Sequence, residues 1–435
     1  MAAQENQGKK RHPKPKQKPV LPIEAAITAW ASNLPSGSAL GRGEVGVAEL
    51  AAQAPKRWTV YEPMVLLPSG SFATSAWTSL KSTLSSSQLD DLWLNILSEI
   101  SRKSGTSYTH LAVNEGIPLH LREHDDSSTA ENGNENILRS PSGLQVLYGN
   151  FGKCNLSSAT DLATESDFEA AFWVSTKQNG IYQTWAPRWT MFSRGNIKEK
   201  ARVLSFHQPT EPALQHRAMN PSALRDKWAV DMYAGIGYFV FSYAKLGMRV
   251  LCWELNPWSV EGLRRGAVAN GWSVRVIRGD ELTSDVDLGA MIAGDTRIVV
   301  FQEDNAMALQ RIQQARQKLA DHQHGLGSID EPSSLDVLHV NCGFLPTSEP
   351  CWKDAITITQ DSPRAWLHLH ENVGVADIEK RKTEIGDKLT SMVSREDSPR
   401  APAAIGVEHV ELVKTYAPGV WHCVFDSYSC ASESA

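Results

Sequence analysis

The chain has 435 residues, more than one ordinary domain holds, so roughly two or three domains are expected. Its composition, 41% hydrophobic and 21% charged, is that of a globular protein, and its net charge of −6 does not by itself indicate a polyanionic partner. No apolar run approaches the roughly 18 residues of a membrane span, so we expect no membrane association. The six scattered cysteines include no C-x-x-C pair, which favours the reducing cytoplasm. We also expect a monomer.

Residues 1–20 are predicted to be a disordered tail. The proline-broken basic run "KKRHPKPKQK" (9–18) cannot bury enough apolar surface to fold. A solubilising role and a phosphate-binding role are both open for this run.

Residues 21–138 are predicted to form an N-terminal α+β region. Apolar spacing predicts helices over 23–34 and 86–101, and the stretch "YEPMVLLPSGSF" predicts a strand ended by a turn. The segment 123–137 is acidic, polar and without period, which is typical of a surface insertion. A middle α+β region is predicted over 139–225.

Between residues 226 and 430 the pattern changes to alternating strands and helices. Such alternation predicts an α/β domain with a doubly wound, mainly parallel sheet of the Rossmann-like class. The predicted strands are 227–233, 249–255, 297–304, 335–341 and 365–373, the predicted helices are 237–247, 257–271, 305–320 and 378–394, and a predicted hairpin closes the domain at 409–428.

The stretch "DMYAGIGYF" (231–239) is a glycine-containing turn between the first strand and the first helix of this domain. Gly235 and Gly237 allow the backbone to turn tightly and to approach a ligand at the helix N-terminus. Val240 stands where a dinucleotide-binding motif has its third glycine, which disfavours a nicotinamide oxidoreductase. Glu254 ends the second strand, where a carboxylate can accept hydrogen bonds from both ribose hydroxyls. Together these features favour S-adenosylmethionine as the cofactor.

Asp304 and Asn305 end the third predicted strand, at the same edge of the sheet. An Asp-Asn pair can accept a hydrogen bond from an adenine amino group and donate one to a ring nitrogen. The same pair can also cap the following helix, and the two uses are compatible.

The chain resembles the wybutosine-synthesis aminocarboxypropyltransferases, relatives of the tRNA guanine N1-methyltransferases. The resemblance is carried by "APRWTMFSRGNIKEKAR", "DMYAGIGYF", "WELNPWSVEGLRRGAVANG", "EDN", "VNCGFLPTSE", "LHLHENV" and "VKTYAPGVWHCVFD". It implies a class I S-adenosylmethionine-dependent methyltransferase-like fold, S-adenosylmethionine as group donor and tRNA(Phe) as partner. By the family pattern, the cofactor-binding positions are Ser193, Lys200, Glu254, Asp304 and Asn305.

The stretch "NCGFLPTSE" (341–349) bears on which group is transferred. The methyltransferase relatives have Asn-x-Pro here, whereas Asn341 is followed by Gly343 and a later Pro346, as in the aminocarboxypropyltransferases. The resemblance therefore implies transfer of the 3-amino-3-carboxypropyl group to C-7 of 4-demethylwyosine beside the anticodon. We place Asn341 among the cofactor-binding residues and Pro346 among the substrate-binding residues. A tRNA guanine N1-methyltransferase, or a protein that binds tRNA and S-adenosylmethionine without turnover, is the alternative.

The segment 185–202 interleaves basic and aromatic side chains. Cations can hold phosphates while rings stack on bases, so Arg188 and Arg194 are predicted to bind the substrate. The resemblance implies that Lys200 binds the methionyl carboxylate instead. A solvated basic face over a small aromatic core is the alternative explanation of the segment.

The stretch "HLHE", with His368, His370 and Glu371, resembles part of a metal motif. No third ligand is evident beside it, so no metal is expected. The nucleophile of the implied reaction is a ring carbon of the substrate, so no protein nucleophile is required and no catalytic residue is predicted.

Overall fold

The computed structural model describes residues 20–34, 46–114, 120–121, 134–135, 144–152, 163–283, 294–326, 335–393 and 404–430. The basic run 9–18 lies outside the described residues, as does most of the insertion 123–137. The chain divides into two compact units, one of Met1–Glu115 with Gln145–Asn150, the other of Gly116–Leu144 with Phe151–Ala435. The domain boundaries at 138 and 225 stay predictions.

The first unit packs helices against a four-stranded sheet of order β1-β2-β3-β6. Its longest helix begins with a capping box, in which the Ser85 hydroxyl accepts a hydrogen bond from the backbone N–H of Gln88 while the Gln88 side chain accepts one from the N–H of Ser85. Its elements are α1 (Pro22–Ser32), α2 (Val47–Ala52), β1 (Thr59–Tyr61), β2 (Met64–Leu67), α3 (Ser75–Thr83), α4 (Ser86–Ser104), β3 (His110–Val113) and β6 (Gln145–Tyr148).

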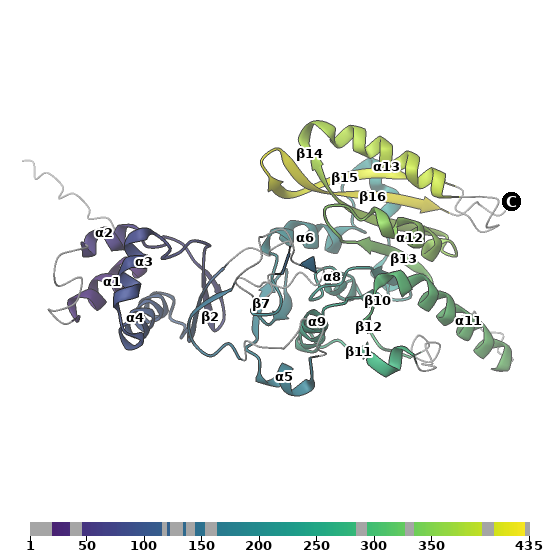
Figure 1. The fold of residues 1–435 in the computed structure, drawn as a ribbon. Coiled ribbons are helices and arrows are strands. Elements are labelled where there is room, and N and C mark those ends of the chain that lie inside the picture. The colour runs from purple at the N-terminus through teal and green to yellow at the C-terminus, as the bar shows by residue number, and fades with distance from the viewer. Residues whose placement is uncertain are drawn as a thin grey trace, which may run out of the picture. The chain divides into compact units, whose positions relative to one another are not determined.

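The second unit is built on an eight-stranded sheet of order β11-β12-β10-β9-β13-β14-β16-β15 (Figure 1). The strands from β11 to β14 run parallel to one another, and β16 and β15 add an antiparallel edge. The doubly wound, mainly parallel sheet predicted from the sequence is confirmed. The strands are β9 (Trp228–Asp231), β10 (Arg249–Trp253), β11 (Val274–Ile277), β12 (Ile298–Phe301), β13 (Val337–Cys342), β14 (Arg364–Gly374), β15 (Ala404–Ala417) and β16 (Val420–Cys430).

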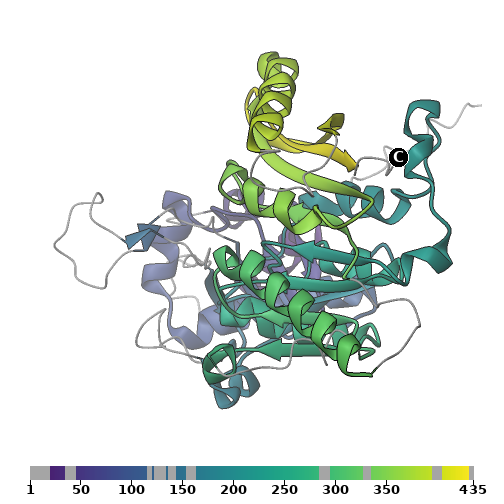
Figure 2. The same cartoon turned by 90° about the vertical axis from the view of Figure 1, so that its right-hand side faces the viewer.

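Helices cover both faces of this sheet. Side chains of α11, α12 and α13 belong to one buried cluster and those of α6, α8 and α9 to another. Figure 2 shows α11 in front of the strands and α13 at the top. Central strands buried on both faces are apolar almost throughout, as β9 and β12 are here. The helices are α6 (Ile197–Ser205), α7 (Pro221–Leu224), α8 (Val240–Lys245), α9 (Pro257–Ala269), α11 (Ala308–Leu326), α12 (Trp352–Thr359) and α13 (Ile378–Met392).

Shorter elements complete the second unit. A hairpin of β7 and β8 packs against α9. The remaining elements are β4 (His120–Leu121), β5 (Asn134–Glu135), α5 (Glu165–Ala170), β7 (Val174–Gln178), β8 (Ile181–Trp185), and the 3-10 turns η1 (Arg194–Asn196), η2 (Pro212–Arg217), η3 (Gly279–Leu282), η4 (Asn305–Met307), η5 (Glu349–Cys351) and η6 (Val375–Asp377).

Three buried imidazoles form a row on the face of β13 and β14 where Phe206 and Tyr243 pack. His207 contacts His339 through their Nε2 atoms at 2.9 Å, and the Nδ1 of His339 lies 2.9 Å from the Nε2 of His368. The row ends at the Arg217 carbonyl, 2.7 Å from the Nδ1 of His207, and at the Asp426 carboxylate, 2.8 Å from the Nδ1 of His368. We call these three rings the histidine row.

Candidate functional site

The glycine turn lies between β9 and α8 and needs glycine at two positions. Gly235 and Gly237 have φ values of 54° and 89°, in the left-handed region that side chains disfavour. A Cβ atom on Gly237 would lie 2.6 Å from the Phe241 ring. The turn is therefore shaped by glycine, and the absence of side chains at these positions makes room for the rings of Tyr238 and Phe241.

Glu254 follows β10 and reaches back to this turn. Its Oε2 accepts a hydrogen bond from the N–H of Gly235 at 2.8 Å, and its Oε1 accepts one from the N–H of Asn256 at 2.8 Å. Burial raises the pKa of Glu254 in spite of these hydrogen bonds, which favour the charged form. Each carboxylate oxygen has a second lone pair, so ribose hydroxyls can be accepted as well.

Asp304 and Asn305 stand beyond β12, at the same carboxyl edge of the sheet. The exposed Asp304 caps η4 through a 2.9 Å hydrogen bond from the N–H of Ala306 to its Oδ1. Asn305 is next to Tyr233 of the glycine turn, where its hydrogen bond opposes the rise that burial causes in the pKa of Tyr233. The capping use foreseen from the sequence is confirmed, and binding of adenine stays a prediction.

Asn341, at the end of β13, is held by a buried carboxyl group. Its amide donates a 3.1 Å hydrogen bond to the Oδ1 of Asp231, which also accepts the N–H of Tyr233 at 3.1 Å. The other oxygen of Asp231 has no hydrogen-bond partner among the described residues. Burial raises the pKa of Asp231 to about 7. The hydrogen bond between Asn341 and Asp231 therefore joins the start of the glycine turn to the start of the loop after β13.

Lys200 is a buried cation beside the glycine turn. Only 3% of it is exposed, and its Nζ donates to the side-chain oxygens of Gln178 and Gln183, both at 2.7 Å. Its ammonium lies 4.9 Å from the ring centre of Phe192 and 5.7 Å from that of Tyr238. Among the described residues no carboxylate forms an ion pair with it, and burial lowers its pKa to about 8. A carboxylate ligand would complete this environment.

Ser193 is tied to the glycine turn through Tyr238. The Ser193 N–H donates to the Tyr238 hydroxyl at 3.0 Å, and that hydroxyl donates to the carbonyl of Met191 at 2.5 Å. The Ser193 hydroxyl accepts a 3.1 Å hydrogen bond from Lys414, a residue that the sequence did not single out. The structure therefore brings Ser193 and Lys200 to the same aromatic wall, with Tyr238 in contact with both.

The three predicted substrate-binding residues lie in different surroundings. Arg188 is half-buried with its guanidinium 6.0 Å from the ring centre of Phe151, and Arg194 is exposed at the start of η1. Pro346 is exposed in the loop after β13, where its carbonyl accepts the N–H of Asn372 at 2.8 Å. Substrate binding by these three residues stays a prediction.

Glu371 anchors the loop after β13. Its Oε1 accepts the Thr347 hydroxyl at 2.6 Å and the N–H of Ser348 at 3.1 Å, while its Oε2 pairs with Arg381 at 3.0 Å. Ahead of this anchor, the Phe344 ring stacks on Tyr233 of the glycine turn, with 5.0 Å between ring centres. The loop is therefore fixed at one end and in contact with the glycine turn at the other. Apart from its place in "HLHE", no sequence pattern indicated this role of Glu371.

The histidines of "HLHE" are engaged with protein groups. His368 belongs to the histidine row, and the Nδ1 of His370 lies 2.9 Å from the Nε2 of His422. Within the described part of the chain, no cluster of three or more His, Cys, Asp or Glu side chains could hold a metal ion. None of the described helices is long and apolar enough to cross a membrane.

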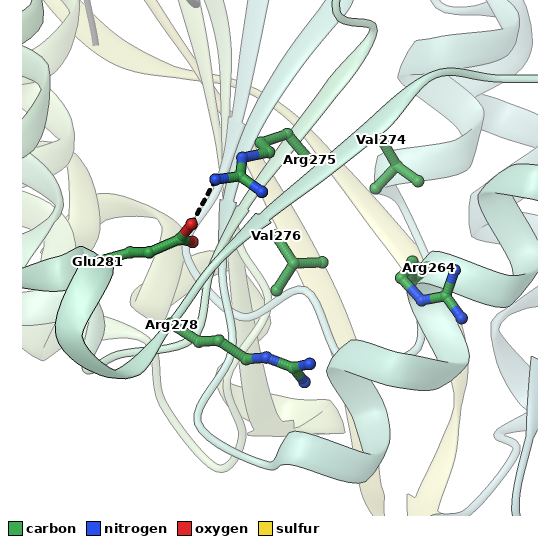
Figure 3. Close-up of a pocket in the computed structure, with 6 residues that line it drawn as sticks. All are labelled: Arg264, Val274, Arg275, Val276, Arg278 and Glu281. Atoms are coloured by element: carbon green, nitrogen blue, oxygen red, sulfur yellow. Dashed lines mark hydrogen bonds and ion pairs between the residues drawn. The ribbon is translucent and has the colours of Figure 1, made fainter. Parts of the chain in front are cut away.

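A pocket at the far edge of the sheet holds none of these residues. Figure 3 shows it between β11 and α9. Arg275 pairs with Glu281 at 2.5 Å, and Arg264 pairs with Glu261 at 2.7 Å, so carboxylates balance these guanidinium groups. Its lining residues are Arg264, Val274, Arg275, Val276, Arg278 and Glu281.

The open sheet, with a glycine turn after its central strand and acids beyond the next two, defines a class I S-adenosylmethionine-dependent methyltransferase-like protein. The tRNA wybutosine-synthesizing protein 2 of Schizosaccharomyces pombe is 36% identical over 373 residues, which cover 86% of this chain and 72% of that protein. The chain belongs to the tRNA wybutosine-synthesizing protein 2 family.

Other comparisons agree with this assignment. The protein of the same name from Saccharomyces cerevisiae is 29% identical over 419 residues, covering 92% of this chain and 80% of that protein. The crystal structure of TYW2 from P. horikoshii in complex with MeSAdo has a TM-score of 0.50 at 17% identity, covering 94% of this chain and 100% of that chain, which supports the fold. No protein family model matches the chain.

Proposed function

We propose that the protein transfers the 3-amino-3-carboxypropyl group of S-adenosylmethionine to C-7 of 4-demethylwyosine beside the anticodon of tRNA(Phe). The observation that carries the proposal is the 36% identity to tRNA wybutosine-synthesizing protein 2 along most of both chains. A sulfonium in this site supplies an electrophilic γ-carbon. C-7 forms a bond to that carbon, the carbon–sulfur bond breaks toward sulfur, methylthioadenosine leaves, and C-7 loses its proton.

The residues of the site fit such a donor. Glu254 lies beside the glycine turn, and its carboxylate has lone pairs that can accept hydrogen bonds from ribose hydroxyls. Lys200 is a buried ammonium without a carboxylate partner among the described residues, which suits the methionyl carboxylate. Donor and acceptor atoms must meet at about 3 to 3.5 Å for efficient transfer, so rigid elements should hold both substrates.

The loop over 341–349 is the part of the site suited to choosing the transferred group. It follows Asn341, contacts the glycine turn through Phe344, and is fixed by Glu371. A loop held at both ends can keep the methyl group away from the base and present the γ-carbon instead. This assignment rests on the pattern of Gly343 and Pro346 in the sequence.

The site of action and the state of the protein belong to the same proposal. We keep the cytoplasm as the compartment, because the five described cysteines are all free thiols. A monomer that acts on tRNA(Phe) is the simplest form consistent with one complete set of cofactor-binding residues in one chain.

Two labelled donors test the proposal. The protein is incubated with precursor tRNA(Phe) and S-adenosylmethionine labelled either in the methyl group or in the carboxyl group. Carboxyl label in the tRNA together with methylthioadenosine is the expected result, and a tRNA(Phe) transcript with an unmodified guanosine serves as the control substrate. Methyl label in the tRNA would identify a methyltransferase instead, and binding of both substrates without any product would indicate a non-catalytic protein.

A further inference from the structure

Lys414 of β15 is a second half-buried lysine at the edge of the site, 221 positions from the residue it contacts. Its Nζ donates a 3.1 Å hydrogen bond to the Ser193 hydroxyl. Among the described residues, no carboxylate forms an ion pair with Lys414, and its ammonium group is hydrogen-bonded to Ser193. The ammonium group is thus directed at the site without a countercharge of its own.

Gly195 makes this position possible. A Cβ on Gly195 would lie 2.5 Å from the Cδ of Lys414 and 3.2 Å from its Nζ, so the lysine stem lies directly across the backbone of η1. The φ angle of Gly195 is not positive, so its backbone conformation does not require glycine. The absence of a side chain makes room for Lys414 instead. Gly195 thus accommodates the stem of Lys414, and the Ser193 hydroxyl orients its ammonium group.

The surroundings of Lys414 call for an anion. Burial lowers the pKa of Lys414, since the ammonium is partly removed from water. Burial and the charge of Lys414 together lower the pKa of His422 to about 4, so the neighbouring ring is neutral. The Nδ1 of His422 is buried without a hydrogen-bond partner among the described residues. An oxyanion bound beside Lys414 would stabilise the charged ammonium group and so offset the effect of burial on its pKa.

Lys200 and Lys414 lie in different surroundings, and each lacks a carboxylate partner among the described residues. Lys200 is 3% exposed behind Phe192 and Tyr238, which suits the enclosed arm of the donor. Lys414 is half-buried and lies across η1, whose first residue is the exposed Arg194. A position at the rim beside another cation suits a phosphodiester of the large substrate.

We propose that Lys414, oriented by Ser193 and accommodated by Gly195, binds a backbone phosphate of the RNA substrate close to the target base. The proposal rests on the function proposed above in taking RNA as the substrate. It makes Ser193 a shared residue that links the donor side of the site to the RNA side. Lys414 is then a positioning residue, because it holds the phosphate and not the reacting carbon.

RNA affinity measured at several salt concentrations tests this role without any need for turnover. The slope of log K for tRNA against log salt concentration is negative, and Lys414→Gln should make it shallower by roughly 0.7 to 0.9, the change expected for one lost phosphate contact. The same variant should bind tRNA several-fold more weakly near about 0.1 M salt. Gly195→Ala should act in the same direction, because it displaces the stem while keeping the charge. Lys414→Arg should retain most of the slope.

The controls separate the possible readings. Lys380→Gln, at a residue 75% exposed on α13, should change neither the slope nor the affinity for S-adenosylmethionine. In turnover assays Lys414→Gln should raise KM for tRNA far more than it lowers kcat.

Weaker S-adenosylmethionine binding with an unchanged tRNA salt slope would overturn the proposal and assign Lys414 to the donor carboxylate. Unchanged binding of both ligands with a lower melting temperature would also overturn it and leave a packing role. Failure of the wild-type protein to bind tRNA would instead count against the proposed function.

Discussion

The hydroxyl of Thr347 donates a 2.6 Å hydrogen bond to the carboxylate of Glu371. Thr347→Val keeps the size of the side chain and removes this bond, so the loop after β13 loses one of its two hydrogen bonds to the Glu371 carboxylate. We expect the single-turnover transfer rate to fall about tenfold, in line with the roughly 1.5 to 3 kcal/mol of a hydrogen bond to a charged group. Thr347→Ser keeps a hydroxyl and should retain most of the rate. Equal rates in the two variants would show that the attachment does not position the loop.

Glu254→Gln should weaken the binding of S-adenosylmethionine. The amide oxygen can accept only one of the two N–H groups, of Gly235 and Asn256, that the carboxylate accepts, and the side chain loses the negative charge that strengthens hydrogen bonds from the ribose. The expected loss is about 1.5 to 3 kcal/mol, measured by titration calorimetry. Glu281→Gln is the matched control, because Glu281 lies in the pocket between β11 and α9 and should leave the affinity unchanged. An unaltered affinity in the first variant would refute the ribose contact.

Asp231→Asn should change how stability depends on pH. Asp231 has an ordinary pKa of 3.8 that burial, with a smaller contribution from Glu254, raises to about 7, so the folded protein holds a proton that the unfolded chain releases. Stability from this group is present below about pH 4 and is lost as pH rises toward 7. Asparagine never ionises and can accept both hydrogen bonds that Asp231 accepts.

At pH 8 the variant should therefore be more stable than the wild type by up to roughly 4 kcal/mol of unfolding free energy, and it should melt at a higher temperature. This gap in melting temperature should close toward about pH 4. Thermal melts at one-unit pH intervals, without added S-adenosylmethionine, measure the gap. A gap that is constant across this range would mean that Asp231 does not titrate there.

Lys200 should make donor binding depend on pH. Burial lowers the pKa of its ammonium to about 8, so the free protein loses this charge as pH rises above 8. The affinity for S-adenosylmethionine should then fall by up to about tenfold per pH unit. Methylthioadenosine lacks the methionyl carboxylate and should bind equally across this range. Lys200→Gln should remove the part of the S-adenosylmethionine dependence that arises from the protein, and an unchanged profile in this variant would exclude Lys200 as the carboxylate partner.

The sequence predicted the sheet well where apolar runs are long. It missed β11, because a four-residue edge strand with Arg275 in it lacks a continuous apolar signal, and it missed α12, which lies between two strongly apolar strands. The glycine turn and Glu254 are close in sequence order and were found together. Contacts such as Lys414 with Ser193 depend on how β15 folds back onto η1, which no local pattern encodes.

The histidine row has a consequence for charge. Its four hydrogen bonds would need four ring protons, and three neutral imidazoles bring only three. Burial lowers the pKa of His207 to about 4 and the pKa of His339 well below its ordinary value, so these two rings are neutral. Burial disfavours the charge of Asp426, but Arg202 and His368 hold its pKa well below the ordinary value, so the row ends at a carboxylate.

The carboxylate at the end of the row belongs to a buried ion-pair network. Arg202 pairs with Glu199 and Asp426, and Arg217 pairs with Asp426 and Glu408. Asp426 therefore joins the histidine row to both arginines. Arg202 and Asp426 are 224 positions apart in the sequence, so a change at this one carboxylate would separate α6 and η2 from β14 and β16 at the same time.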